Sequence, residues 1–188
     1  YAAWQKEIAD PGMVAIDLSL KELSQASFIP HCRSVFEKHG VSPRRVELEI
    51  TETTLMLDAE RTLPLLDELR AMGVHLSIDD FGTGYSSLSA LQQFPIGTLK
   101  IDQSFVRNAA TDPDDATIVR TIIEMGRSLG LQVLAEGIET EEQRDFLLQS
   151  GCQFGQGRLF GHPVSADEFL ELVLKQATGE HPVLRLPA

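Results

Sequence analysis

The sequence lacks most of the features that mark secreted, membrane-spanning or zinc-binding proteins. It contains only two cysteines, Cys32 and Cys152, which lie far apart and in no metal-ligand spacing. We therefore expect two reduced thiols in a cytoplasmic protein. The five histidines are scattered, which argues against a zinc site. No apolar run is long enough to cross a bilayer, and the chain does not open with a signal-peptide pattern.

Basic residues are also scarce. The chain has 16 Lys and Arg against 28 Asp and Glu, which gives a net charge of −12. Proteins that bind DNA or RNA polymers depend on Lys and Arg contacts to the phosphates, so we expect no such partner. A small anionic substrate is still compatible with this charge if metal ions lie between the protein and the phosphate.

The length and composition fit one globular domain. The chain has 188 residues, of which 43% are hydrophobic, enough for a core. It begins with Tyr1 rather than Met, which indicates a piece of a longer protein. No repeat or linker divides it, so we expect one domain over residues 1–177 and a C-terminal tail with little structure over 178–188.

Strand-like runs alternate with helical patterns along the chain. The strand candidates are 13–19, 46–50, 74–79, 98–102, 131–137 and, more weakly, 151–157; the helical segments include 28–39, 59–72 and 116–129. This alternation predicts a parallel α/β fold, either an open doubly wound sheet or a (β/α) barrel. A complete barrel takes about 250 residues, so six strands would leave the barrel without its opening quarter.

Helix boundaries are marked by capping residues. Asp112 followed by Pro113 predicts a helix start, and Gly130 predicts a stop. The sequences from Thr140 and from Ser165 each form a capping box with the Gln or Glu three residues later.

Most of the strand candidates end in acidic or amide side chains. The residues concerned are Asp17, Glu47, Glu49, Glu52, Asp79, Asp80, Asp102, Glu136, Glu139 and Gln156, together with Lys100. Because the carboxyl ends of parallel strands share one face, we expect these side chains to converge on one crevice. Clustered carboxylates are costly without a cation and suit hard divalent ions such as magnesium or manganese.

Each of these residues also has a simpler explanation. A single acid after a strand is usually a helix N-cap or a solvated loop residue, and a single Lys100 is usually a surface lysine or a salt-bridge partner. The loop FGTGYSS (81–87) matches neither the Walker pattern nor the dinucleotide fingerprint. It is either a tight turn beside the acids or a plain turn with Ser86 or Ser87 as N-cap. The recurrence of acids in strand after strand favours a functional site.

Five longer strings resemble the motifs of one known family. ELEITE (47–52), IDDFGTGYSSL (78–88), LKIDQSFV (99–106), AEGIET (135–140) and GCQFGQGRLF (151–160) are similar, in order and spacing, to the EAL family of cyclic di-GMP phosphodiesterases. The resemblance implies a TIM-type (β/α) barrel with an antiparallel first strand. The barrel would be incomplete here, because its first strands, including the strand of the EAL motif, are absent. Residues 1–177 would then form a partial EAL domain.

The resemblance also implies an activity and partners. Members hydrolyse one phosphodiester bond of cyclic di-GMP to linear pGpG with two Mg²⁺ or Mn²⁺ ions. They often form homodimers, and a GGDEF or sensory domain often precedes them in a longer cytoplasmic or membrane-anchored protein.

By motif position, the resemblance implies roles for individual residues. Glu49 matches a ligand of the first metal, Asp79 the aspartate shared by both metals, and Asp80 a ligand of the second. Lys100 matches the lysine that holds the attacking water. Glu136 matches a second-metal ligand that some proposals make the base.

Further positions match polar residues around that site. Glu52 matches a residue that steadies the loop after the third strand, and Asp102, Glu139 and Gln156 match substrate-contacting or supporting positions. Asp17 stands where the family usually has an asparagine; it can still ligate a cation, with more negative charge.

Other departures from the family keep alternatives open. The glutamate of the EAL motif is absent, Arg158 replaces a usual tyrosine, and GHP (161–163) replaces SRP or SKP. An active phosphodiesterase is our main hypothesis, because nearly all the site acids are present. A degenerate domain would instead act as a cyclic di-GMP receptor or a regulatory protein-interaction module. A third hypothesis is a non-functional fragment with exposed sheet edges.

Overall fold

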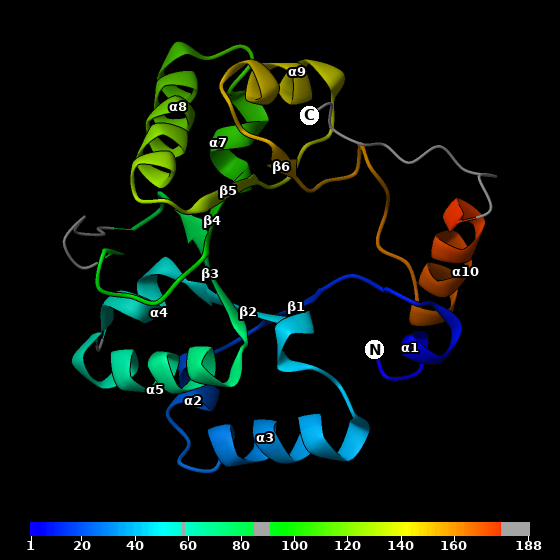
Figure 1. Cartoon of the computed structure of the whole chain (residues 1–188). Coiled ribbons are helices and arrows are strands. Elements are labelled where there is room, and N and C mark those ends of the chain that lie inside the picture. Colours follow the sequence, from blue (N-terminus) through cyan, green and yellow to red (C-terminus); the bar gives the residue numbers. More distant parts are fainter. Residues whose placement is uncertain (58, 85–90, 178–188) are drawn as a thin grey trace.

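The computed structural model describes residues 1–57, 59–84 and 91–177, so the N-cap expected at Ser86 or Ser87 and the tail at 178–188 lie outside the described residues. The described chain forms one sheet in sequence order: β1 (Val14–Asp17), β2 (Val46–Thr51), β3 (His75–Phe81), β4 (Thr98–Ile101), β5 (Gln132–Ala135) and β6 (Phe154–Gly155). Every neighbouring pair is parallel. The sheet curls into an incomplete barrel (Figure 1), which confirms the barrel and excludes the open doubly wound sheet.

Most of the helices follow a strand and cover the outer face of the curl, while the first and last helices lie beside its opening (Figure 1). The helices of the described ranges are α1 (Trp4–Glu7), α2 (Leu20–Leu23), α3 (Phe28–His39), the 3₁₀ turn η1 (Pro43–Arg45), α4 (Glu52–Leu57), α5 (Ala59–Met72), α7 (Gln103–Asn108), α8 (Pro113–Ser128), α9 (Glu141–Gln149) and α10 (Ala166–Ala177). None of the helices in the described ranges is long and apolar enough to span a membrane.

Alternate side chains of each strand point to the two faces of the curled sheet. One set packs against the helices outside, and the other set faces the interior of the curl. Leu48 and Ile50 of β2, with Leu76 and Ile78 of β3, are buried in the core shared with the helices. Because side chains alternate along a strand, the residues between them face the interior of the curl. In β2 one of those residues is Glu49, so the interior of this barrel is polar at the carboxyl end of its strands.

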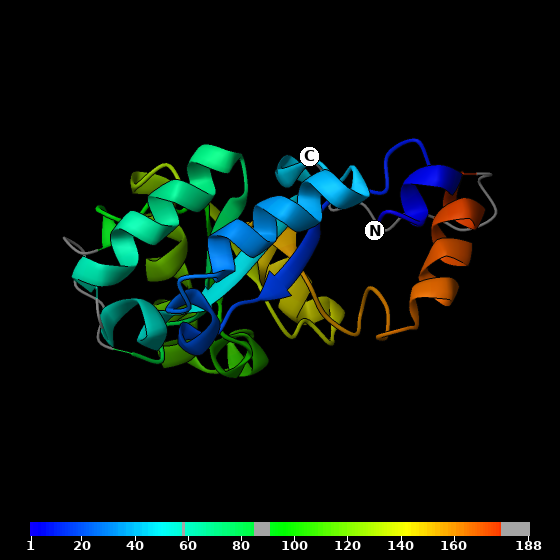
Figure 2. The ribbon, with the colours of Figure 1, turned by 90° about the horizontal axis from the view of Figure 1, so that it is seen from below.

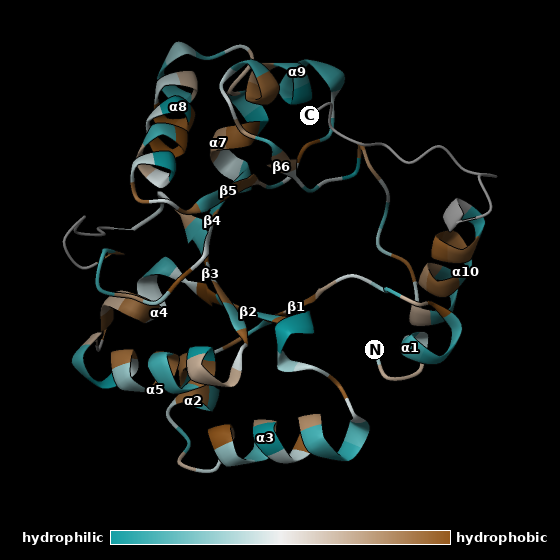
Figure 3. Ribbon diagram, in the orientation of Figure 1, coloured by the Kyte–Doolittle hydropathy of each residue, from teal (hydrophilic) through white to brown (hydrophobic). Residues whose placement is uncertain are grey.

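The curl is open between β1 and β6, and apolar side chains are exposed on that side. Ile16 of β1 is 49% exposed and Phe154 of β6 is 45% exposed. Figure 2 shows α1 and α10 together beside this opening, and Figure 3 shows hydrophobic residues along much of α10. The two helices are joined through Trp4, whose ring centroid lies 4.7 Å from that of Phe169.

The capping residues predict the helix starts well. Asp112 accepts hydrogen bonds from the N–H groups of Asp114 and Asp115, and Pro113 opens α8. The boxes at Thr140 and Ser165 both form. α8 begins at Pro113, the start that the cap predicts, three residues before the apolar period begins. The weak sixth strand is reduced to Phe154–Gly155.

Candidate active site

Five carboxylates meet at the carboxyl ends of the strands. They form two groups, Asp17 with Glu49 and Asp79, and Asp79 with Asp80 and Glu136. Within each group, one carboxylate oxygen from every residue lies within 4.8 Å of the others. Asp79 belongs to both groups. The residues come from β1, from β2, from the end of β3 and from the position after β5.

Lys100 of β4 lies among these acids. Its Nζ is 2.6 Å from Glu49 Oε2, 2.7 Å from Glu136 Oε1 and 3.1 Å from Asp79 Oδ1. The Lys100 side chain is only 4% exposed. A buried ammonium is held in place by such contacts, so Lys100 is part of the cluster and not a surface lysine.

The electrostatics of the cluster show too many acids for one cation. Burial raises the pKa of the Glu49 and Glu136 carboxyls, although Lys100 opposes the shift. Burial and the neighbouring Asp79 raise the pKa of Asp80. Burial alone would lower the pKa of Lys100, but its hydrogen bonds to Glu136 and Glu49 outweigh burial, so its pKa lies above the ordinary value. Lys100 therefore stays charged while several acids resist ionisation.

An irregularity in β3 allows Asp79 and Asp80 to reach the same cluster. Successive side chains of a regular strand point to opposite faces. Here the register with β4 shifts between Ile78 and Phe81, and Asp80 has a φ of 52°, in the left-handed region. Aspartate tolerates this conformation better than most residues. The Thr83 hydroxyl donates to the Asp80 carbonyl at 2.8 Å and fixes the turn.

The cluster fits divalent cations. Asp79 Oδ1 is buried, and within the described ranges its polar contact is the 3.1 Å ion pair with Lys100, whose ammonium also serves Glu49 and Glu136. Five carboxylates with a single ammonium leave an excess of negative charge, and carboxylate oxygens are the ligands that magnesium and manganese prefer. The sharing of Asp79 between two groups of oxygens provides for a pair of ions.

Two further acids support the loops around the cluster. Glu52, the first residue of α4, is buried, and its Oε2 accepts from the N–H groups of Gly82 at 2.9 Å and Gly84 at 3.2 Å. It lies directly behind the loop after β3. Asp102 caps α7 by accepting from the Ser104 N–H at 3.0 Å, and its charge contributes to the raised pKa of Asp80.

Glu139 and Gln156 lie differently from the other predicted residues. Glu139 is outside both groups of acids, and its carboxylate lies 3.4 Å from the exposed guanidinium of Arg158. Gln156 holds the loops together through its main chain, donating to the Ala135 carbonyl and accepting from the Ile138 N–H.

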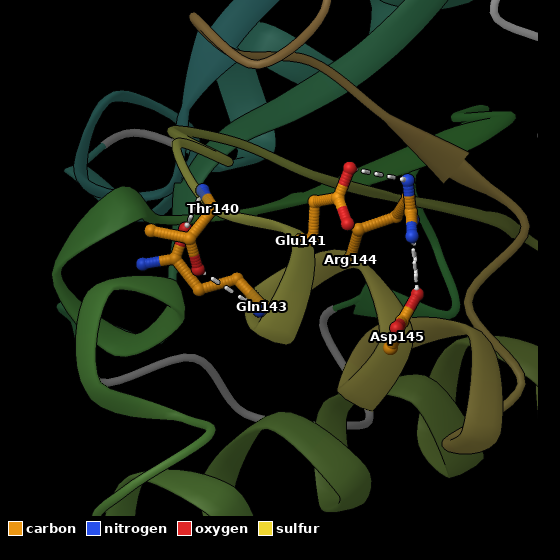
Figure 4. A network of polar contacts seen from close by, with 5 residues as sticks. All are labelled: Thr140, Glu141, Gln143, Arg144 and Asp145. Carbon is orange, nitrogen blue, oxygen red and sulfur yellow. Dashed lines mark hydrogen bonds and ion pairs between the residues drawn. The ribbon is translucent and has the colours of Figure 1, made fainter.

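Gln143 of α9 is a residue whose full role the sequence did not reveal. The capping box with Thr140 was predicted, and Figure 4 shows the two side chains facing each other. In addition, the Gln143 amide donates to the Arg107 carbonyl of α7 at 3.0 Å. Nothing in the sequence links these two residues, because the contact depends on how two helices pack.

Comparisons with known proteins agree with this geometry. A family model described as "EAL domain" matches residues 1–163. The bifunctional diguanylate cyclase/cyclic di-GMP phosphodiesterase MucR of Pseudomonas aeruginosa is 45% identical over 160 residues, covering 85% of this chain and 23% of MucR. The chain thus spans about a fifth of the length of the curated relatives it matches.

Two solved structures of such proteins superimpose closely on this chain. The MucR phosphodiesterase in complex with c-di-GMP has a TM-score of 0.85 at 42% identity, covering 89% of this chain and 68% of that one. Klebsiella pneumoniae BlrP1 in a manganese/c-di-GMP complex has a TM-score of 0.79 at 31% identity, covering 86% and 42%.

Proposed function

The chain belongs to the EAL domain family, and we propose that it hydrolyses one phosphodiester bond of cyclic di-GMP to give linear pGpG. The observation that carries this proposal is the convergence of five carboxylates at the strand ends, three of which form ion pairs with the buried Lys100. MucR is named as a cyclic di-GMP phosphodiesterase and its structure contains c-di-GMP, which supports the same substrate here.

We propose that two divalent ions, Mg²⁺ or Mn²⁺, bind the cluster. Asp17, Glu49 and Asp79 would hold one ion, and Asp79, Asp80 and Glu136 the other. The BlrP1 structure is a manganese complex, which supports a divalent ion at the corresponding site here. When bound, such a pair of ions neutralises charge on the phosphodiester and makes water a better nucleophile.

The protein's own side chains would orient the water and move its proton. Lys100 keeps its charge and has donor N–H bonds directed at the centre of the acids, so it can hold the attacking water by hydrogen bonding. Glu136 is our candidate for the proton acceptor, because its carboxylate lies 2.7 Å from the ammonium that would hold the water. Glu52 keeps the loop after β3 in place beside the ligands. Glu139, Gln156 and Asp102 would line the substrate's path.

The family membership also guides proposals about the larger protein. We assign residues 1–177 to a partial EAL domain whose remaining barrel strands lie in another part of the protein. A cytoplasmic location, a homodimer and an upstream GGDEF or sensory domain are further expectations. The free thiols of Cys32 and Cys152 are compatible with a cytoplasmic location. The exposed apolar residues at the edges β1 and β6 are compatible with a further segment or a second subunit that covers them.

A second function is favoured by one observation. Asp17 places an extra negative charge in the first group of acids, where the family usually has a neutral asparagine. If this charge holds the ion in an unproductive state, the domain would bind cyclic di-GMP and act as a receptor or regulatory module.

One experiment separates these functions. The full-length protein is incubated with cyclic di-GMP and Mg²⁺ or Mn²⁺, pGpG is measured by chromatography, and binding is measured by calorimetry. We expect pGpG from the wild type and none from Lys100→Met, whereas Lys175→Met, on the exposed face of α10, should behave as the wild type. Binding without product would establish the receptor, and neither binding nor product would refute both functions.

A further inference from the structure

We propose that Gln143 is a positioning residue that fixes Glu136 relative to Lys100, and so sets the geometry of the second group of acids. The inference rests on the proposed metal-dependent function. The Gln143 side chain forms three hydrogen bonds, all to main-chain groups and none to the five clustered acids.

The Gln143 side-chain amide makes three of the four hydrogen bonds that it can form. Gln143 is 6% exposed. Its Oε1 accepts from the N–H groups of Glu139 at 2.7 Å and Thr140 at 3.0 Å. Its Nε2 donates to the Arg107 carbonyl at 3.0 Å. In Figure 4 the Gln143 side chain reaches back to Thr140, while Arg144 of the same helix pairs with Glu141 and Asp145.

These bonds join two strand–helix units of the barrel. Arg107 lies in α7, which follows directly after Lys100 and β4. Glu139 and Thr140 lie in the loop that begins at Glu136 after β5. One amide therefore spans the two units whose charged groups meet at 2.7 Å in the Lys100–Glu136 ion pair.

The loop is packed against α7 at a second point. Gly137 has a φ of 68°, and a Cβ there would lie 2.6 Å from Gln103 Cβ at the start of α7. The Glu136 N–H also donates to the Ile101 carbonyl at 3.2 Å. The Gln143 hydrogen bonds fix the other end of this loop, at Glu139 and Thr140, to α7. The loop is therefore attached to the β4–α7 unit both at Glu136 and three to four residues after it.

The choice of glutamine over glutamate supports this role. Three capping boxes lie within the described chain, and in the other two the third helical residue is Glu22 or Glu168, both exposed. A glutamate caps as well as a glutamine, because capping uses only acceptor oxygens. It cannot, when ionised, donate to the Arg107 carbonyl. The buried box thus carries the one side chain that can bind both units.

Reciprocal substitutions test the proposal. Gln143→Glu keeps the cap and loses the donor to Arg107, Gln143→Met loses both, and Glu168→Gln makes the opposite exchange in the exposed box of α10. Mn²⁺ binding by the full-length protein is measured by electron paramagnetic resonance, at a temperature where circular dichroism shows each variant folded. Steady-state hydrolysis of cyclic di-GMP is measured alongside.

We expect both Gln143 variants to bind Mn²⁺ about 10-fold or more weakly, the usual loss when a group that orients a ligand is removed. Their kcat should fall while the KM for cyclic di-GMP changes less, and Glu168→Gln should match the wild type in every measurement. A folded Gln143→Glu with the wild-type Mn²⁺ affinity would overturn the inference. So would failure of both Gln143 variants to fold while Glu168→Gln folds, because the role would then be structural.

The outcomes also separate this inference from the proposed function. If the wild type binds Mn²⁺ without hydrolysing cyclic di-GMP, the function fails, and the Mn²⁺ affinities still decide the role of Gln143. If the wild type hydrolyses the substrate and Gln143→Glu binds Mn²⁺ equally well, only the inference fails. A wild type that binds no Mn²⁺ would overturn both.

Discussion

Replacing Lys100 by Met should destabilise the metal-free protein strongly. The Lys100 side chain is 4% exposed and lies within 3.1 Å of three carboxylates. Removing one partner of a buried ion pair costs about 3–5 kcal/mol, because the other charge stays buried without compensation. In a protein of this size, about 1 kcal/mol shifts the melting temperature by about 2–4 °C. We therefore expect a loss of about 6–20 °C at pH 8 in the presence of a chelator.

The loss should depend on pH and on metal ions. Without Lys100, the pKa values of Glu49 and Glu136 rise further in the folded state, so the folded variant binds more protons than the unfolded chain. Stability then increases as the pH falls, and the deficit relative to the wild type should shrink towards pH 5. Saturating Mn²⁺ should shrink it as well, because the ions replace the missing positive charge.

Differential scanning calorimetry at pH 8 and pH 5, with chelator or with Mn²⁺, measures these effects. The control is Lys175→Met, which removes an exposed lysine 3.6 Å from Glu171 one helical turn away. Such pairs contribute at most about 0.5 kcal/mol. Equal melting temperatures for Lys100→Met and the wild type at pH 8 in chelator would refute the reasoning, and so would a deficit that does not change with pH.

Three further predictions follow from the site. In the metal-free wild type, the raised pKa values of Asp80 and Glu136 make these two groups bind more protons in the folded state than in the unfolded chain, so their contribution to stability should grow as the pH is lowered through those raised pKa values. Saturating Mn²⁺ should abolish or reverse this contribution, which a comparison of melting temperatures between the wild type and Asp80→Asn across the pH range measures. Asp80→Asn should weaken Mn²⁺ binding but fold normally, whereas Asp80→Ala should cost about 1 kcal/mol more in a denaturant titration, because alanine is less tolerant of a positive φ. Gly157→Ala should lower both the melting temperature and Mn²⁺ affinity, because its Cβ would lie 2.1 Å from the Ile138 carbonyl oxygen, while Gly161→Ala, with open space around it, should do neither.

The convergence of the acids could be predicted because each acid stands at the end of a recognisable strand and parallel strands share one carboxyl end. An acid at the end of one strand means little, but parallel strands place their carboxyl ends together, so Asp17, Glu49, Asp79 and Glu136 had to converge once the fold was right. The helix caps at Asp112 and Thr140 are equally local. Their hydrogen bonds lie within three residues of the cap and need no information about the rest of the chain.

The features that could not be predicted depend on contacts between distant segments. The short helix α7 packs on α8 and α9, and its six residues have too weak a period to be recognised. The left-handed Asp80 results from the register shift between β3 and β4. The contact of Gln143 with Arg107 joins residues 36 positions apart. The sequence shows which residues are polar, but not which main-chain groups they will face.

The adjacent pair Asp79–Asp80 is best explained by a fold that depends on ions for part of its stability. Lys100 is the cation bound within the cluster, and one ammonium cannot neutralise five carboxylates. The raised pKa values of Glu49, Asp80 and Glu136 show that ionising them in the folded state is unfavourable. An ion that binds only the folded state, at a free concentration 100 times its dissociation constant, raises the free energy of unfolding by about 2.7 kcal/mol. Mn²⁺ should therefore raise the melting temperature even without substrate, and a melting temperature unchanged by Mn²⁺ would mean that the acids are compensated in some other way.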